Sequence, residues 1–166
     1  MKRLLLLIFA LASICMVAEA GNRKRNKANA DTEQFRYDLE YVKSAGAGVV
    51  SVKVWSYSRR ASLAYEQSRK NAVHGVLFKG YSGAGATHRP MVKDISVLYD
   101  NEEFFKSFFA DGGEYQRYVV SSSTQAEELM KVGKDYKALS TVQVNVQALR
   151  KRLEEANIIT SLSHGF

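Results

Sequence analysis

The chain has 166 residues, of which 46% are hydrophobic and 25% are charged, and it carries a formal net charge of +7 with one cysteine and one proline. This length and apolar content suit one domain with a real hydrophobic core, which excludes disorder throughout. Only one stretch, at the N-terminus, is apolar enough to enter a bilayer, which excludes a protein with several membrane spans.

The first 20 residues have the three parts of a secretory signal peptide. Lys2 and Arg3 precede an uninterrupted apolar run, Leu4–Val17, and small residues in Ala18–Ala20 supply an exit site. As a helix, the apolar run would rise about 21 Å, less than the hydrocarbon core of a bilayer, so we expect cleavage after residue 20 and no permanent anchor. The pattern predicts an exported protein, either periplasmic or associated with the outer membrane.

The only cysteine, Cys15, lies within this apolar run. Lipid attachment requires a small residue before the cysteine, whereas Ile14 stands there, so we favour removal of Cys15 with the signal peptide over its acylation. The exported chain would then have no thiol, which excludes disulfides and cysteine chemistry, and its fold would depend on its core alone.

Residues 21–34 form a basic leader with almost nothing apolar to pack, and we expect it to be disordered. Its cations are Arg23, Lys24, Arg25 and Lys27. The simplest interpretation is a solvated charge run; the alternative is attraction to an anionic membrane or glycolipid surface, at about 1 kcal/mol per basic residue. We predict no nucleic-acid partner, because an exported protein rarely meets one.

Alternation of apolar and polar residues predicts a hairpin at the start of the domain, which we expect to span residues 35–166. Residues 35–41 alternate with period two, and small residues at 44–48 form a turn into a second strand, 49–57. One face of this second strand consists of Val50, Val52 and Val54. The opposite face carries Lys53, Trp55 and Tyr57.

A helix is predicted from an N-cap at Ser58 to about Phe78, because small residues recur on one side at helical spacing. Its polar residues, His74 among them, are expected to face water. Residues 80–88 are rich in glycine, and Pro90 disfavours helix just before it, so we expect an exposed loop there.

Four phenylalanines dominate a short helix that we expect to be capped by Asp100 or Asn101 and to end at Gly112–Gly113. They are Phe104, Phe105, Phe108 and Phe109. We favour a place in the core over a ligand site, because burying the cluster would stabilise the fold by several kcal/mol.

The last third of the chain predicts a meander of strands at 114–121, 128–134 and 136–146, followed by a helix that begins at Asn145 or Gln147. The predicted order is β-β-α-α-β-β-β-α. Strands grouped in hairpins, with helices between the groups, favour an α+β domain: an antiparallel sheet of four to five strands with two to three helices packed on one face.

Two segments resemble a family of envelope proteins. The first is the valine-rich strand that leads through Ser58–Arg60 into an alanine-spaced helix ending at Asn71–Val73, and the second is the closing stretch 142–159. Together they resemble the small periplasmic α+β domain at the N-terminus of flagellar assembly protein T and related outer-membrane lipoproteins. The resemblance implies a non-enzymatic envelope module that docks on other secreted or outer-membrane components, and it supplies no catalytic residues.

No pattern for catalysis, a metal or a cofactor emerges from the sequence. The segment around Ser82 approaches a G-x-S-x-G elbow, but Ala84 replaces the last glycine and the segment follows a helix. The three histidines, His74, His88 and His164, lack the spacing of a zinc site, and no carboxylates are spaced as a hydrolytic dyad. We therefore predict a protein that is not an enzyme.

Recognition of another molecule remains, and the candidate binding residues fall into two groups. Lys53, Trp55 and Tyr57 form an aromatic and basic strip if the helices cover the valine face, whereas a loop or the phenylalanine helix would cover Trp55 in the alternative arrangement. The predicted loop adds Tyr81, His88 and Arg89. The leading hypothesis is an envelope adaptor that binds another protein; the alternative is a small-ligand or polysaccharide-binding protein that stacks its ligand on the aromatic strip.

Overall fold

The computed structural model describes residues 22–160, without the side chains of residues 124–127. After a helix at residues 22–33, the elements are β1 (Tyr37–Ser44), β2 (Val49–Ser58), α2 (Ala61–His74) with a π-helical extension (Gly75–Lys79), β3 (Tyr81–Gly83), β4 (Ala86–His88), α3 (Ser96–Asp100), α4 (Glu102–Phe108), a 3-10 turn (Glu114–Tyr118), β5 (Val119–Val132), β6 (Asp135–Asn145) and α5 (Val146–Glu155). No helix within these residues is both long and apolar enough to cross a membrane. The predicted signal peptide, Cys15 and His164 lie outside the described residues.

The strands form one mixed, mostly antiparallel sheet in the order β4-β3-β1-β2-β6-β5, so the predicted α+β class is confirmed. The single parallel pairing joins β1 to β3. The sheet has six strands, against the four to five predicted: residues 80–88 add β3 and β4, whereas the strands predicted at 114–121 and 128–134 fall in one strand, β5. Along β5 the pairing with β6 shifts between Thr124 and Leu129.

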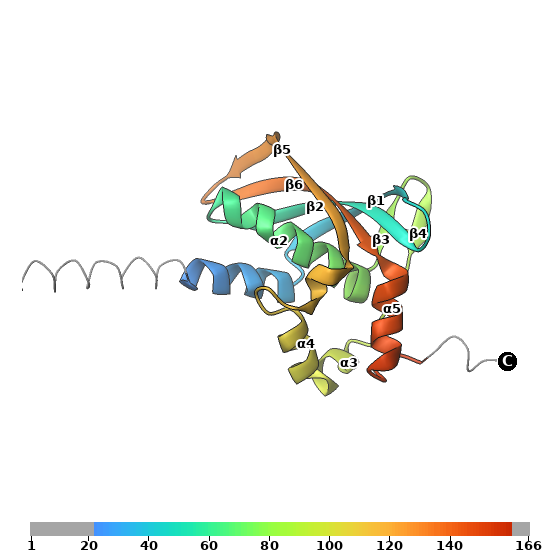
Figure 1. Cartoon of the computed structure of the whole chain (residues 1–166). Coiled ribbons are helices and arrows are strands. Elements are labelled where there is room, and N and C mark those ends of the chain that lie inside the picture. The colour runs from blue at the N-terminus through green and yellow to red at the C-terminus, as the bar shows by residue number, and fades with distance from the viewer. Residues whose placement is uncertain (1–21, 161–166) are drawn as a thin grey trace, which may run out of the picture.

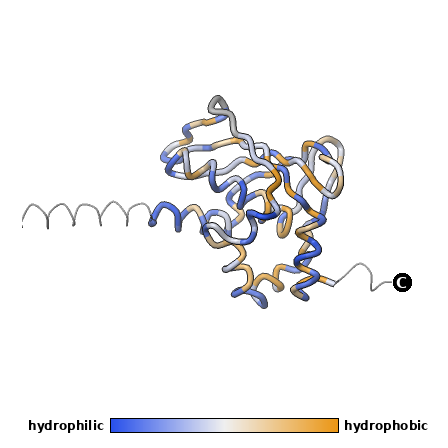
Figure 2. The backbone as a smooth tube through the Cα atoms, viewed as in Figure 1, coloured by the Kyte–Doolittle hydropathy of each residue, from blue (hydrophilic) through white to orange (hydrophobic). Residues whose placement is uncertain are grey.

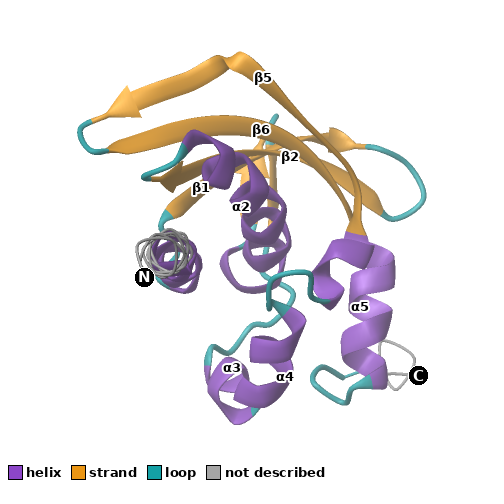
Figure 3. Ribbon diagram, turned by 60° about the vertical axis from the view of Figure 1, so that its left-hand side comes forward, coloured by secondary structure: helices purple, strands orange, loops and turns teal. Residues whose placement is uncertain are grey.

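The helices of the described chain lie beneath the sheet, which curves over them (Figures 1 and 3). The hydropathy of residues alternates along the strands (Figure 2), and the valines of β2 face the helices, where they are buried with Val142 and Val144 of β6. Leu149 and Leu153 of α5 complete this layer. The start of α5 follows the prediction, because Asn145 Oδ1 accepts a hydrogen bond from the Ala148 amide at 2.9 Å.

The phenylalanine cluster belongs to the core, as predicted. Phe105 and Phe108 are buried, and Phe104 and Phe109 pack against them partly buried. Phe108 stacks on Tyr118 with ring centroids 5.8 Å apart, which joins α4 to the turn before β5. That turn is a 3-10 helix over residues 114–118, so the strand predicted from residue 114 begins only at Val119.

The predicted disorder of residues 21–34 is wrong for residues 22–33, which form a helix packed on α2. Ala28 is buried there. The sequence suggested disorder because this segment has few apolar residues, but buried hydrogen bonds between polar side chains hold the helix in place. Thr32 Oγ1 donates to Asn71 Oδ1 at 2.5 Å, and Gln67 Nε2 donates to Thr32 Oγ1 at 2.7 Å. Asn71 Nδ2 in turn donates to Ser56 Oγ of β2 at 2.8 Å.

Helix α2 is buried on the predicted side, where Ala64, Ser68 and Ala72 lie, and also on a second side that was predicted to face water. Gln67, Lys70, Asn71 and His74 are buried beneath the N-terminal helix and the segment that follows it, although their polarity suggested a face in water. The predicted N-cap is also wrong, because Ser58 is the last residue of β2 and Arg60 occupies the N-cap without a capping side chain.

Residues 80–88 form a hairpin and not the predicted loop. Ala84 and Gly85 both have positive φ, 46° and 76°, which suits the tight turn between two antiparallel strands. Gly83 lies so close to β1 that a Cβ atom there would be 2.4 Å from the Tyr41 carbonyl oxygen. The glycines thus serve a tight turn and a close approach of two strands, and not a flexible segment.

Candidate functional site

The predicted strip on β2 lies on the sheet face turned away from the helices. Lys53, Trp55 and Tyr57 alternate with buried residues and are each half-buried. No described helix lies over this face in Figure 3, and α4 packs on the opposite side. The alternative in which the phenylalanine helix covers Trp55 is therefore wrong.

The neighbouring strands extend this strip into a larger surface. Lys137 of β6 lies opposite Tyr57, and its Nζ atom is 4.6 Å from the centroid of the Trp55 ring and 5.3 Å from that of Tyr57. Met130 lies opposite Lys137 on β5, and Val132 lies opposite Asp135. Residues directly opposite in an antiparallel pair share a face, so these side chains continue the same surface.

We call this surface the aromatic patch: Trp55, Tyr57, Met130, Val132 and Lys137. Met130 and Val132 are large apolar side chains that remain 46% and 51% exposed, on the strand at the edge of the sheet. Sequence reasoning missed both of them and Lys137. The alternation of 136–146 identified a strand, but the faces shared with Trp55 depend on the register between β2, β6 and β5.

The other predicted binding residues, Tyr81, His88 and Arg89, lie at a separate place. They line a groove of about 590 Å³. Its other lining residues include the start of α5, which lies near the β3–β4 hairpin in Figure 1. Tyr81 is buried and stacks on His88, with ring centroids 4.7 Å apart and an interplanar angle of 18°. Tyr41 of β1 packs on His88 at 4.7 Å. The structure thus divides the six predicted residues between two surfaces.

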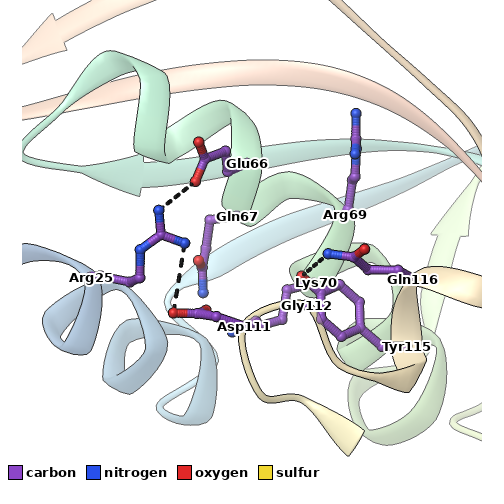
Figure 4. A pocket seen from close by; sticks show the side chains of 9 residues that line it. All are labelled: Arg25, Glu66, Gln67, Arg69, Lys70, Asp111, Gly112, Tyr115 and Gln116. Carbon is purple, nitrogen blue, oxygen red and sulfur yellow. Dashed lines mark hydrogen bonds and ion pairs between the residues drawn. The ribbon is translucent and has the colours of Figure 1, made fainter. Parts of the chain in front are cut away.

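A smaller polar pocket of about 280 Å³ lies where the N-terminal helix meets α2 and the turn after α4 (Figure 4). Four of its charged side chains are paired with one another, and the fifth, Arg69, donates to Ser122 Oγ at 2.8 Å. Arg25 lies 3.0 Å from a Glu66 carboxylate oxygen and 3.6 Å from one of Asp111. Lys70 Nζ donates to Asp111 Oδ1 at 3.1 Å and to Asn29 Oδ1 at 2.6 Å.

Lys70 is the residue of this pocket that most resembles a catalytic group. Burial lowers the pKa of its ammonium, and the Asp111 carboxylate acts in the opposite direction. A lysine nucleophile needs a free and accessible amine. Here the amine is enclosed and engaged by Asn29 and Asp111, so the pocket serves to hold the N-terminal helix on α2.

His74 is part of a buried polar pair and not the solvated residue that its helical position suggested. It is 3% exposed, and its Nδ1 atom lies 2.8 Å from the Tyr37 hydroxyl. Burial, followed by the charge of Lys79, lowers the pKa of His74 to about 3. Burial also raises the pKa of the Tyr37 hydroxyl well above its usual range. Aromatic rings from Phe35, Phe78 and Phe109 enclose the imidazole, which closes it to any substrate.

Neither a nucleophile elbow nor a metal site is formed by the described residues. Ser82 lies in β3 opposite Thr87 of the same hairpin, whereas an elbow needs a turn from a strand into a helix. Within residues 22–160, no group of three histidine, cysteine or acidic side chains is placed to hold a metal ion.

Comparison with known proteins adds no family to this description: the chain matches no protein-family model, and no curated protein or solved structure is significantly similar to it. The resemblance to the N-terminal domain of flagellar assembly protein T stays a prediction.

Proposed function

We propose that the protein is a non-enzymatic binding module of the cell envelope and that the aromatic patch is where it contacts another protein. The observation that carries this proposal is the sheet face turned away from the helices, which two half-buried aromatic rings of β2 share with two apolar side chains of β5 that are about half exposed. The envelope location follows from the signal-peptide pattern in residues 1–20. The docking role also agrees with what the family resemblance implies.

The patch has the composition of a protein-binding surface. Tryptophan and tyrosine supply large contact areas at a low cost in side-chain entropy, and they are enriched among the residues that dominate binding energy. Lys137 lies over both rings and fixes them before a partner arrives. A matching partner would present apolar side chains to Met130 and Val132, with a carboxylate near Lys137.

The same lysine disfavours the alternative of a polysaccharide-binding protein. A sugar stacks on a free face of an aromatic ring, whereas Lys137 lies over one face of both rings and Arg36 also lies over Tyr57, at 5.7 Å from its centroid, so stacking on these faces would displace a cation. A protein partner meets no such conflict, because it can contact the ring edges and the methylene groups of the lysine.

The double substitution M130E/V132E is expected to abolish partner binding. Both side chains are exposed and contact the partner in this proposal, and two carboxylates would be buried at a desolvated interface, at a cost of several kcal/mol. The measurement is capture from an envelope extract on the immobilised protein, followed by identification of the partner and titration of the purified pair. We expect the affinity to fall at least about a hundredfold.

The control variant is Y99E, which places a carboxylate on α3 at an apolar side chain that is 71% exposed and lies outside the patch. It should bind as the unmodified protein does. Equal binding by all three proteins would overturn the proposal, as would an unmodified protein that captures no partner in stoichiometric amount.

A further inference from the structure

We propose that the groove between the β3–β4 hairpin and α5 binds a ligand that carries a phosphate monoester group. Three cationic side chains from two segments of the chain line this groove. Arg89 follows β4, Lys93 lies four residues further along the chain, and Arg150 lies on α5. No aspartate or glutamate lines the groove.

Two of these cations, Arg89 and Lys93, differ from those of the polar pocket because their side chains have no hydrogen-bond or ion-pair partner among the described residues. Arg150 forms one ion pair among the described residues, with Glu154 one turn further along α5, at 3.4 Å. In the polar pocket, by contrast, Arg25 and Lys70 each meet the carboxylate of Asp111.

Gathering like charges in a concave site costs free energy, which an anion offsets when it binds. A phosphate monoester suits this arrangement because it carries up to two charges and three terminal oxygens. Arginine meets such oxygens with parallel hydrogen bonds, and lysine adds a compact charge. A single carboxylate would leave part of this donor set unused.

Stacked aromatic rings form part of the groove wall. His88 lines the groove, and its Nε2 atom is enclosed without a partner among the described residues. Stacking on Tyr81 and contact with Tyr41 hold the ring in place. Because the Nε2 atom is enclosed, a ligand in the groove meets the edge of this aromatic wall and not the atom itself, so the proposal rests on the three cations.

The size and the apolar part of the lining indicate that the phosphate belongs to an organic molecule. A volume of about 590 Å³ lies within the usual range for small-molecule sites and far exceeds that of a phosphate ion. Val76, Pro90 and Met91 supply an apolar wall that a carbon skeleton would cover. The phosphate monoester of a soluble metabolite and that of a lipid headgroup share the same chemistry.

The experiment measures binding of two probes to the purified protein. Glycerol 3-phosphate represents a soluble ester and is titrated by calorimetry; phosphatidic acid in phosphatidylcholine vesicles represents a lipid and is tested by co-sedimentation. Binding of the soluble ester identifies a metabolite site, whereas binding only of vesicles that contain phosphatidic acid identifies a lipid site. Both results support the proposal, and binding of neither probe overturns it.

Charge-neutralising variants separate a built site from general attraction by a basic protein. R89Q and R150Q are each expected to weaken binding about tenfold or more, because each removes a cation from the groove. The matched control is K106Q, which makes the same change in net charge at an exposed position of α4. An equal loss in all three variants would overturn the proposal, and thermal melts confirm that each variant is folded.

Discussion

Lowering the pH from about 6.5 toward 3 should remove several kcal/mol from the free energy of unfolding, most of it through His74. Burial holds the pKa of this imidazole at about 3 in the folded protein, whereas a histidine in the unfolded chain titrates near 6.5. Between these values the unfolded chain binds a proton that the native protein does not. Stability is therefore full above about pH 6.5 and falls by up to about 1.4 kcal/mol per pH unit below it.

A second group extends the loss at lower pH. The hydrogen bond from Arg152 lowers the pKa of Glu114, so its contribution is present above the pKa of an unfolded glutamate, about 4.3, and is lost as the pH falls through its lower folded value. This partly buried ion pair adds less than His74 does. Between about pH 4.5 and 6.5, His74 should dominate the pH dependence.

Urea unfolding at a series of pH values between about 4.5 and 7.5 measures this slope. The variant H74Q should flatten it, because the amide does not titrate yet is able to meet the Tyr37 hydroxyl. Y37F is the control: it removes the hydroxyl but keeps the rings that bury His74, and burial is the first cause of the lowered pKa. It should keep the slope. A flat profile in the unmodified protein, or an unchanged slope in H74Q, would contradict the assignment.

Sequence periodicity correctly predicted the elements that are covered on one side only. The alternation of β2 placed its valines inside and Trp55 outside, because a strand in a sheet with one covered face follows period two. The last strand and the cap of α5 at Asn145 were predicted for the same kind of local reason. The phenylalanine cluster was predicted from its large apolar area.

The prediction failed where a further layer covers polar residues. Helix α2 is buried by the sheet on one side and by the N-terminal helix on another, so the usual rule that polar residues face water does not hold for it. Gln67, Asn71 and His74 recur at helical spacing on that second side. Their partners come from residues 28–37, and no rule of local sequence identifies such a distant match.

In the candidate sites too, residues close in sequence were predicted together, and residues distant in sequence were missed. The alternation of β2 predicted that Trp55 and Tyr57 share a face. That Met130 and Lys137 lie on the same face follows only from the register of β5, β6 and β2. Tyr81, His88 and Arg89 were identified together because they are near in sequence. Arg150 joins them only in the folded chain, where α5 packs beside the hairpin.

Replacing Asn71 by alanine should lower the free energy of unfolding by about 2–3 kcal/mol, because the side chain links the N-terminal helix to α2 and to the sheet. It accepts from Thr32 and donates to Ser56, both of which are buried. In N71A the Ser56 hydroxyl loses its donor and Thr32 loses an acceptor, and buried polar groups without partners carry most of the cost. Urea unfolding measures the change.

Hydrogen exchange identifies which part of the protein is destabilised in N71A. In N71A the amides of residues 22–33 should exchange faster than those of β2 and β6, because the helix has lost its central contact while the valine layer is intact. The matched control is N26A, at an exposed position of the same helix, which should change stability by less than about 0.5 kcal/mol. If residues 22–33 exchange at the rate of a free peptide in the unmodified protein, the polar layer does not hold them, and the basic segment belongs to solvent as its composition alone would suggest.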